Sequence, residues 1–250
     1  MTAVNRYQTQ FGNICCLPND KEFVKALSIG KMYEEDLIVS KIIPFFNNSQ
    51  KYVLLDVGAH IGSHSIIYSK YIPNCEILSF EPQSVLYNIL NKNICDNDIS
   101  NCTIYNNAVG HKAMTTSLSK YVCDYYANTI SEIKYNVDNT INYGAIGLGE
   151  NGENVNMITI DSLNLKQCDY IKIDVEGAEV LVLMGALNTI NLFHPIIFFE
   201  ENGLNVNNAM VKSMKIDFKY ETAREFLIQL GYNVTNVDFC NCIAIHSTRV

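Results

Sequence analysis

The chain has 250 residues, 48% of them hydrophobic, so it can bury a full core, and we read residues 1–250 as a single domain. A formal net charge of −8, with 18 Lys and Arg scattered along the chain, argues against a nucleic-acid partner, because phosphate binding requires a basic face. The nine cysteines form no C-x-x-C pair, and neither a secretory leader nor about 20 consecutive apolar residues occur, so we expect a cytoplasmic protein without a membrane span.

Strand and helix signals alternate along most of the chain. Residues 1–50 are expected to form an N-terminal helical extension, with a helix candidate at 34–46. The following strands are expected near 52–56, 76–81, 102–107, 169–174 and 195–200, and the helices near 63–72, 83–95, 176–190 and 220–230. This order predicts an α/β fold with a parallel sheet and right-handed crossovers. Two short strands at 232–237 and 241–245 predict an antiparallel C-terminal hairpin.

One segment interrupts the alternation. Residues 110–156 are too many for an ordinary loop, so we expect an insertion with small elements of its own that covers the active site. Within it, residues 142–149 are rich in glycine and carry no charge, as is typical of a loop that faces a substrate.

The first strand predicts a ligand site. It ends at Asp56 and is followed by Gly58, Ala59, His60 and Gly62, and then by a helix, as at the carboxyl edge of a parallel sheet where ligands bind. The two glycines permit a tight turn and a close approach of the backbone to a ligand. The pattern lacks the third glycine of a dinucleotide site. An acid at position 56 also fits poorly beside a pyrophosphate, and it suits a zwitterionic, cationic ligand such as S-adenosylmethionine.

The next two strands add candidate cofactor contacts. Glu81 ends the second strand, roughly 20 residues after the glycine turn, which is the offset at which an acid binds ribose hydroxyls. Asn107 and Ala108 follow the third strand, where an adenine would be bound. We therefore assign Glu81 to an unphosphorylated ribose and the other two residues to the base.

The fourth and fifth strands carry the candidates for catalysis. Asp174 ends a strand that is too apolar to tolerate an uncompensated charge, so it is our first candidate for a catalytic base. Glu176 is expected to cap the following helix, and Lys172 to pair with a carboxylate. Glu200, after the fifth strand, is the second candidate. No second ligand stands at an obvious spacing, so we assign no metal site, with Asp174 as the ligand if a divalent metal takes part.

Five segments together resemble a known family. In order and spacing, the chain is similar to the FkbM-type S-adenosylmethionine-dependent methyltransferases from about residue 33 to residue 245. The segments that carry the resemblance are DVGAHIG (56–62), FEP (80–82), NAVG (107–110), TIDSL (159–163) and IKIDVEGAE (171–179). One departure is His60, where the family commonly has Asn. Imidazole can still offer a hydrogen bond there, and it adds a titratable group.

The resemblance implies a fold, a cofactor and a reaction. The fold would be the Rossmann-like class I methyltransferase fold, with a mostly parallel seven-stranded sheet and helices on both faces. The cofactor would be S-adenosyl-L-methionine, and the reaction would be O-methylation of a hydroxyl on a sugar, glycan or other small metabolite.

Two other functions remain open on the sequence alone. A nicotinamide-dependent sugar oxidoreductase would share the fold and Glu81, but the third glycine is missing. A non-catalytic Rossmann-like binding module would be expected to lose some of Asp56, Glu81 and Asp174, and all three are present. We expect a small-molecule or carbohydrate acceptor as the partner, and no membrane. The sequence indicates no particular oligomeric state.

Overall fold

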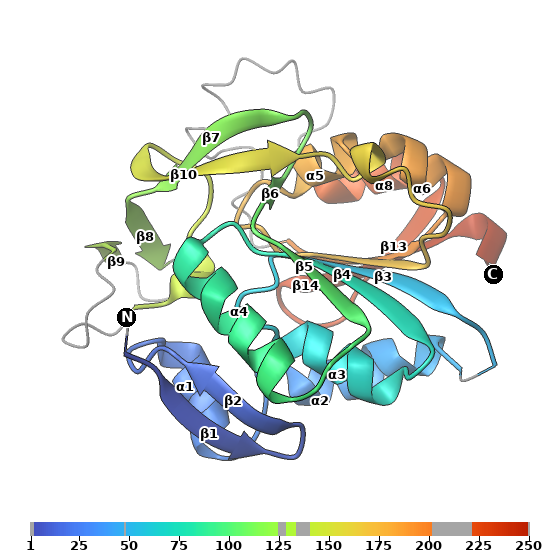
Figure 1. Cartoon of the computed structure of the whole chain (residues 1–250). Helices are drawn as coiled ribbons and strands as arrows, with labels where there is room; N and C mark the ends of the chain where they lie inside the picture. The colour runs from blue at the N-terminus through green and yellow to red at the C-terminus, as the bar shows by residue number, and fades with distance from the viewer. Residues whose placement is uncertain (1–2, 48, 125–128, 134–140, 202–221, 250) are drawn as a thin grey trace.

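A seven-stranded sheet forms the centre of the computed structural model (Figure 1). The structure describes residues 3–47, 49–124, 129–133, 141–201 and 222–249. In spatial order the strands are β13 (Tyr232–Asn236), β14 (Asn241–His246), β12 (Ile196–Glu200), β11 (Tyr170–Ile173), β3 (Tyr52–Val57), β4 (Cys75–Phe80) and β5 (Cys102–Tyr105). β14 runs antiparallel to β12 and β13, and the pairs from β12 to β5 are parallel. The predicted α/β fold, with its mostly parallel sheet and C-terminal hairpin, is confirmed.

Helices cover both faces of this sheet (Figure 1). One face carries α3 (Ser63–Tyr71) and α4 (Ser84–Asp96), and the other carries α5 (Glu179–Met184), α6 (Leu187–Phe193) and α8 (Ala223–Gln229). Side chains of a strand alternate between the faces, so Leu54 joins one hydrophobic cluster and Leu55 the other. β3 is buried along its whole length, which explains its continuous apolar sequence.

The helix predicted over residues 176–190 is wrong in its bounds. It begins at Glu179 and is divided into α5 and α6 around Gly185. A Cβ on Gly185 would lie 1.9 Å from the carbonyl oxygen of Gly110, so the backbone of the insertion approaches the chain at this point. The predicted helix at 220–230 corresponds to α8, and residues 202–221 lie outside the described part of the chain.

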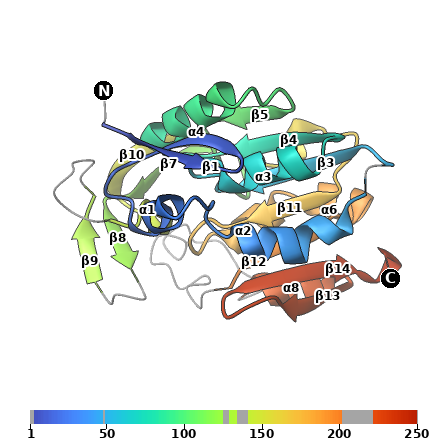
Figure 2. The ribbon, with the colours of Figure 1, turned by 90° about the horizontal axis from the view of Figure 1, so that it is seen from below.

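The N-terminal extension, predicted to be helical, is helical only in part. The chain starts with a β-hairpin of β1 (Asn5–Thr9) and β2 (Gly12–Cys16), followed by α1 (Lys21–Ser28). Helical conformation then runs through α2 (Glu35–Leu37), the π-helix Ile38–Ile42 and the 3-10 helix Ile43–Phe45, as predicted for 34–46. Figure 2 shows the hairpin and α1 beside α4. Most of β1 is exposed or half-buried, so its sequence lacks the apolar alternation that indicates a strand.

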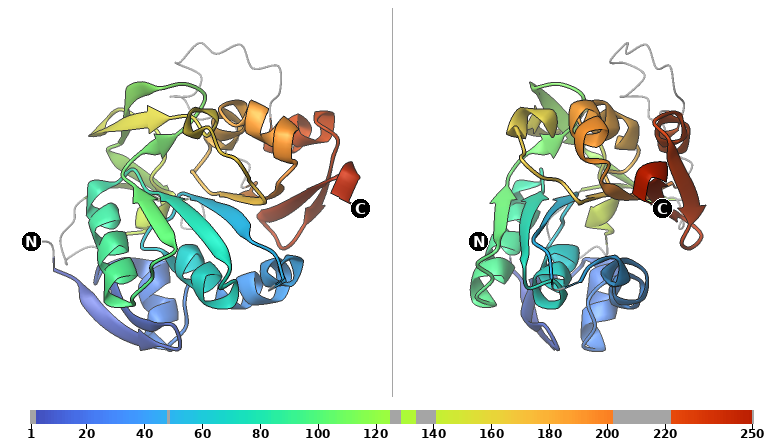
Figure 3. Two further views of the ribbon diagram at one scale, coloured as in Figure 1. Left: turned by 45° about the vertical axis from the view of Figure 1, so that its right-hand side comes forward. Right: turned by 90° about the vertical axis from the view of Figure 1, so that its right-hand side faces the viewer.

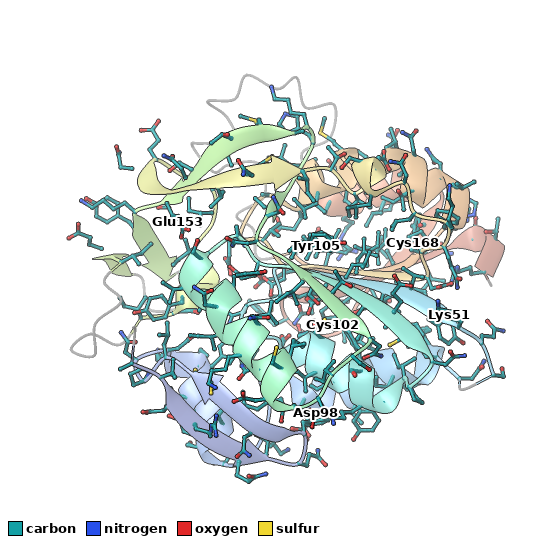
Figure 4. The ribbon with its side chains drawn as sticks, in the orientation of Figure 1. Lys51, Asp98, Cys102, Tyr105, Glu153 and Cys168 are labelled. Atoms are coloured by element: carbon teal, nitrogen blue, oxygen red, sulfur yellow. The ribbon has the colours of Figure 1, made fainter. Side chains whose placement is uncertain are left out.

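The insertion forms a small sheet of its own. β6 (Ala108–Val109), β10 (Asn151–Ile158) and β7 (Met114–Ser119) pair with one another, and a separate hairpin joins β8 (Tyr121–Asp124) to β9 (Thr129–Glu132). Figure 3 shows β7 and β10 above the carboxyl edge of the main sheet. On β10, Glu153 accepts a hydrogen bond from the N–H of Ser84 at 3.2 Å and so ties the insertion to the start of α4 (Figure 4).

The described part of the chain contains no helix of the length and apolarity required to cross a membrane.

Candidate functional site

A pocket of about 180 Å³ opens where four neighbouring strands of the sheet end. Gly58 follows β3, Glu81 follows β4, Asp174 follows β11 and Glu200 ends β12, and all four residues line it. The residues that sequence patterns assigned to different strands therefore meet at one edge, because the carboxyl ends of parallel strands lie side by side.

The glycine loop takes its shape from two left-handed glycines. Gly58 has φ 81°, and a Cβ there would lie 1.8 Å from the carbonyl oxygen of Asp174, so only glycine lets the end of β3 approach β11. Gly62 has φ 96°, and a Cβ there would lie 2.7 Å from Leu90 Cδ1 of α4; Gly62 does not itself line the pocket. Ala59 and His60, between the glycines, do line it.

Glu81 is held by two backbone donors at the wall of the pocket. Its side chain is buried, with Oε2 accepting from the N–H of His60 at 2.9 Å and Oε1 accepting from the N–H of Gln83 at 2.8 Å. Burial raises the pKa of this carboxyl, against the opposing effect of His60 and the two backbone donors. The same pocket is lined by Asn107, whose amide donates to the carbonyl oxygen of Asn156, and by Ala108.

Asp56 lies behind the wall of the pocket and is not one of its lining residues. It is fully buried, accepts a hydrogen bond from Ser65 Oγ at 2.5 Å and lies 3.5 Å from Lys172 Nζ. The carboxylate of Asp56 therefore contacts Lys172, which lines the pocket, and not the pocket itself.

Lys172 connects the buried carboxylate to the pocket. Its side chain is 2% exposed, and its ammonium donates to the carbonyl oxygen of Gly58 at 2.6 Å and lies 3.3 Å from Asp174 Oδ2. Burial by itself lowers the pKa of Lys172, but Asp174, Asp56 and Glu34 outweigh it and leave that pKa raised. The side chain is therefore an ammonium, and the predicted pairing with a carboxylate is confirmed.

Three carboxyl groups converge beside Lys172. Asp174, Glu176 and Glu200 each place one oxygen within 4.8 Å of the other two. Burial and then the charge of Asp174 raise the pKa of Glu200 to about 9, and the same two causes raise the pKa of Glu176 well above its ordinary range. Oxygen ligands of this kind suit Mg²⁺ or Ca²⁺. Sequence spacing gave no second ligand for Asp174, because Glu200 comes from a different strand.

The capping role predicted for Glu176 is wrong. Glu176 sits in the turn before α5 with φ 54°, and its carboxyl joins the cluster with Asp174. Glu179, the first residue of α5, does not cap the helix either: its Oε1 accepts from the N–H of Gly177 at 3.0 Å and of Val175 at 3.4 Å, both in the turn before α5. The turn is longer than the apolar pattern indicated, so the helix begins at Glu179 and not at Glu176.

Sequence reasoning missed two further residues that line the pocket, Glu34 and His64. His64 is 5% exposed; its Nε2 lies 2.9 Å from Glu34 Oε2, and its Nδ1 lies 2.9 Å from the hydroxyl of Tyr68. Residues 63–68 of α3 are all buried, because the N-terminal extension covers the outer face of that helix. No sequence signal links two residues 30 positions apart.

The glycine-rich segment at 142–149 also reaches the pocket. Its lining residues are Asn142, Gly144, Ala145, Ile146, Gly147 and Leu148. A Cβ on Gly147 would lie 2.6 Å from the carbonyl oxygen of Glu176, so the loop passes directly over the turn that carries the acid cluster. An uncharged wall thus faces the carboxyl groups.

Comparison with known proteins finds similarity to methyltransferases. The methyltransferase FkbM domain matches residues 56–234 of the chain. Methyltransferase 1 of Beauveria bassiana (strain ARSEF 2860) is 24% identical over 224 residues, which cover 85% of this chain and 81% of that protein.

Among solved structures, similarity extends to a methyltransferase FkbM from Methylobacillus flagellatus KT. It shares 15% identity at a TM-score of 0.49, over 84% of this chain and 47% of that one, so this chain spans about half of its length. A precorrin-6y C5,15-methyltransferase from Geobacter metallireducens GS-15 shares 14% identity at a TM-score of 0.47, over 92% and 96% of the two chains.

Proposed function

Because this chain belongs to the FkbM methyltransferase family, we propose that it transfers the methyl group of S-adenosylmethionine to a hydroxyl of a sugar, glycan or other small metabolite. The observation that carries this proposal is the placement of Glu81 and Asp174 at the ends of β4 and β11, on either side of β3, in one pocket. Glu81, which we assign to ribose binding, and Asp174, which we assign to proton removal, thereby lie on opposite sides of the glycine loop.

The residues of the pocket suit S-adenosylmethionine. Ser63 Oγ is buried at the pocket wall without a hydrogen-bond partner among the described residues, so it is available to form a hydrogen bond with a polar group of a ligand. Glu81 can accept hydrogen bonds from ribose hydroxyls, and Asn107 with Ala108 would hold the base. When bound, S-adenosylmethionine supplies an electrophilic methyl carbon, which a correctly oriented nucleophile attacks in line.

Asp174 is the residue that we assign to proton removal. Lys172 Nζ lies 3.3 Å from its Oδ2 and holds the carboxyl group at the edge of the pocket, where a carboxylate can accept a proton from the acceptor. Glu200 has a pKa raised to about 9 and therefore retains its proton at neutral pH, which makes it a hydrogen-bond donor rather than the base. Asp174 accepts the hydroxyl proton, while Glu200 and the loop at 142–148 position the acceptor and exclude water.

The turn after β11 and the charge of the chain support the proposed acceptor class. The sequence DVEG (174–177) differs from the Pro-Pro-aromatic turn of many N-methyltransferases that act on bases and amides, and the net charge of −8 disfavours a polyanion. The hydroxyls of a polyhydroxylated, uncharged acceptor would donate hydrogen bonds to the carboxyl groups. The rest of the acceptor would contact the uncharged glycine-rich loop.

Two titrations and a panel of acceptors test the proposal. Calorimetry should show saturable binding of S-adenosylhomocysteine and none of NAD. With labelled S-adenosylmethionine, methyl transfer should occur to hydroxylated sugars or small metabolites, and not to RNA, DNA or peptides. Tighter binding of NAD would favour a nicotinamide-dependent oxidoreductase, and saturable methylation of RNA would contradict the acceptor class.

A further inference from the structure

Asp20 and His60 form a buried pair at the edge of the pocket. Asp20, just before α1, is fully buried, His60 is 7% exposed, and Oδ2 of the first lies 3.1 Å from Nε2 of the second. Among the described residues, neither side chain makes a regular hydrogen bond. A buried carboxylate without hydrogen bonds is costly to maintain, so the imidazole is the group that compensates Asp20.

His60 also orients the carboxylate that we assign to ribose. Its backbone has φ 51°, and its N–H donates to Glu81 Oε2 at 2.9 Å. Its ring stacks on Phe23 of α1, with centroids 3.9 Å apart and planes inclined by 19°. The ring is therefore held by Asp20 and Phe23, both from the N-terminal extension. The ring and the N–H that donates to Glu81 thus belong to one residue, which the extension holds in place.

The N-terminal extension has a second connection to the same loop. Asn93 of α4 is fully buried; its Oδ1 accepts from the N–H of Cys15 at 2.7 Å, and its Nδ2 donates to the carbonyl oxygen of Ile61 at 2.9 Å. β2 and the glycine loop are thus tied through one amide. All of the extension precedes the range 56–234 that matches the family domain.

We propose that Asp20 is a positioning residue of the cofactor site, which holds the glycine loop and Glu81 in place through His60. The N-terminal extension is then part of the cofactor site, and not only a cover of the domain. This inference rests on the proposed function, since it takes Glu81 to bind the cofactor.

Calorimetric titration of the full-length protein with S-adenosylhomocysteine tests the inference. Asp20→Asn and His60→Asn should each weaken binding by about tenfold or more, as expected for a lost charge-assisted contact. The affinity of the double variant should be close to that of the single variant that binds less tightly, because both changes remove the same contact. Asp36→Asn, on the exposed pair with Lys31, is the matched control and should bind like wild type. Circular dichroism verifies folding.

A conservative variant separates positioning from a general loss of stability. Asp20→Glu keeps the carboxylate, so it should recover part of the affinity that Asp20→Asn loses. Folded Asp20→Asn with wild-type affinity would overturn the inference; if that variant does not fold, the same result for His60→Asn would do so. If wild type and Glu81→Ala bind S-adenosylhomocysteine equally well, Glu81 is not part of the cofactor site, and the inference about Asp20 is then also wrong.

Discussion

The ammonium of Lys172 lies 3.3 Å from Asp174 Oδ2 and 3.5 Å from Asp56 Oδ1, so one buried cation joins the ends of β3 and β11. It also donates to the carbonyl oxygen of Gly58, the first glycine of the loop. The proposed base and the proposed cofactor loop therefore depend on the same side chain.

Replacing Lys172 by Met should strongly destabilise the protein. The change keeps the length of the side chain and leaves fully buried Asp56 without its cation, which costs about 3–5 kcal/mol of unfolding free energy. Urea denaturation measures the effect. Lys31→Met is the matched control, because Lys31 pairs with Asp36 on the surface, and its midpoint should hardly move. Equal, small effects for both variants would contradict the structural role of Lys172.

Glu81→Ala should weaken binding of S-adenosylhomocysteine. Loss of a hydrogen-bonded carboxylate is expected to cost about 1.5–3 kcal/mol, or roughly tenfold to a hundredfold in the dissociation constant. Calorimetry provides the measurement. Glu76→Ala, an exposed position on the same strand, serves as the control and should bind normally. Wild-type affinity in folded Glu81→Ala would remove this residue from the cofactor site.

Asp174→Asn should abolish most turnover and preserve binding of S-adenosylhomocysteine. Asn retains the shape but cannot accept the hydroxyl proton, so the rate should fall by about 10²–10⁴-fold. Initial rates with an accepted substrate and calorimetry on the same preparation separate the two quantities, with Glu76→Gln as control. Normal turnover by Asp174→Asn would move the base to another residue, with Glu200 as the next candidate.

Removal of divalent metal should leave turnover unchanged. Lys172 already pairs with Asp174, and Glu200, with a pKa raised to about 9, retains its proton at neutral pH. Rates are compared before and after EDTA, with and without added Mg²⁺. Loss of activity that Mg²⁺ restores would instead assign Asp174, Glu176 and Glu200 to a metal ion, for which their oxygens are close enough.

Glu200→Gln should stabilise the protein increasingly as the pH rises. Burial and Asp174 raise the pKa of Glu200 to about 9, so the folded protein binds a proton there that the unfolded chain, with an ordinary carboxyl, releases near pH 4–5. Wild-type stability at this site is full below that range and is lost progressively up to about pH 9, whereas Gln has no proton to lose. Melting temperatures of both proteins from pH 5 to 10 measure the difference. A constant difference across this range would contradict the raised pKa.

Local sequence was sufficient for the framework of the site. Gly58 could be assigned to a ligand turn because an apolar strand pattern, two glycines and a helix pattern follow one another within a few residues. The same applies to Glu81 and Asp174, each placed directly after an apolar strand. Residues that end neighbouring parallel strands share one edge of the sheet, so the sequence pattern alone predicts that these candidates meet.

Contacts between distant segments could only come from the tertiary structure. Asp20 with His60 and Glu34 with His64 each join residues separated by more than 20 positions, and no periodicity encodes such pairs. The hairpin of β1 and β2 was missed for a related reason, since its outer strand buries little apolar surface. Strands and turns depend on short-range patterns of hydrophobicity and backbone preference, which a sequence displays. The pairing of buried charges depends on how the helices and strands pack together. That packing is determined by contacts between segments from the whole chain.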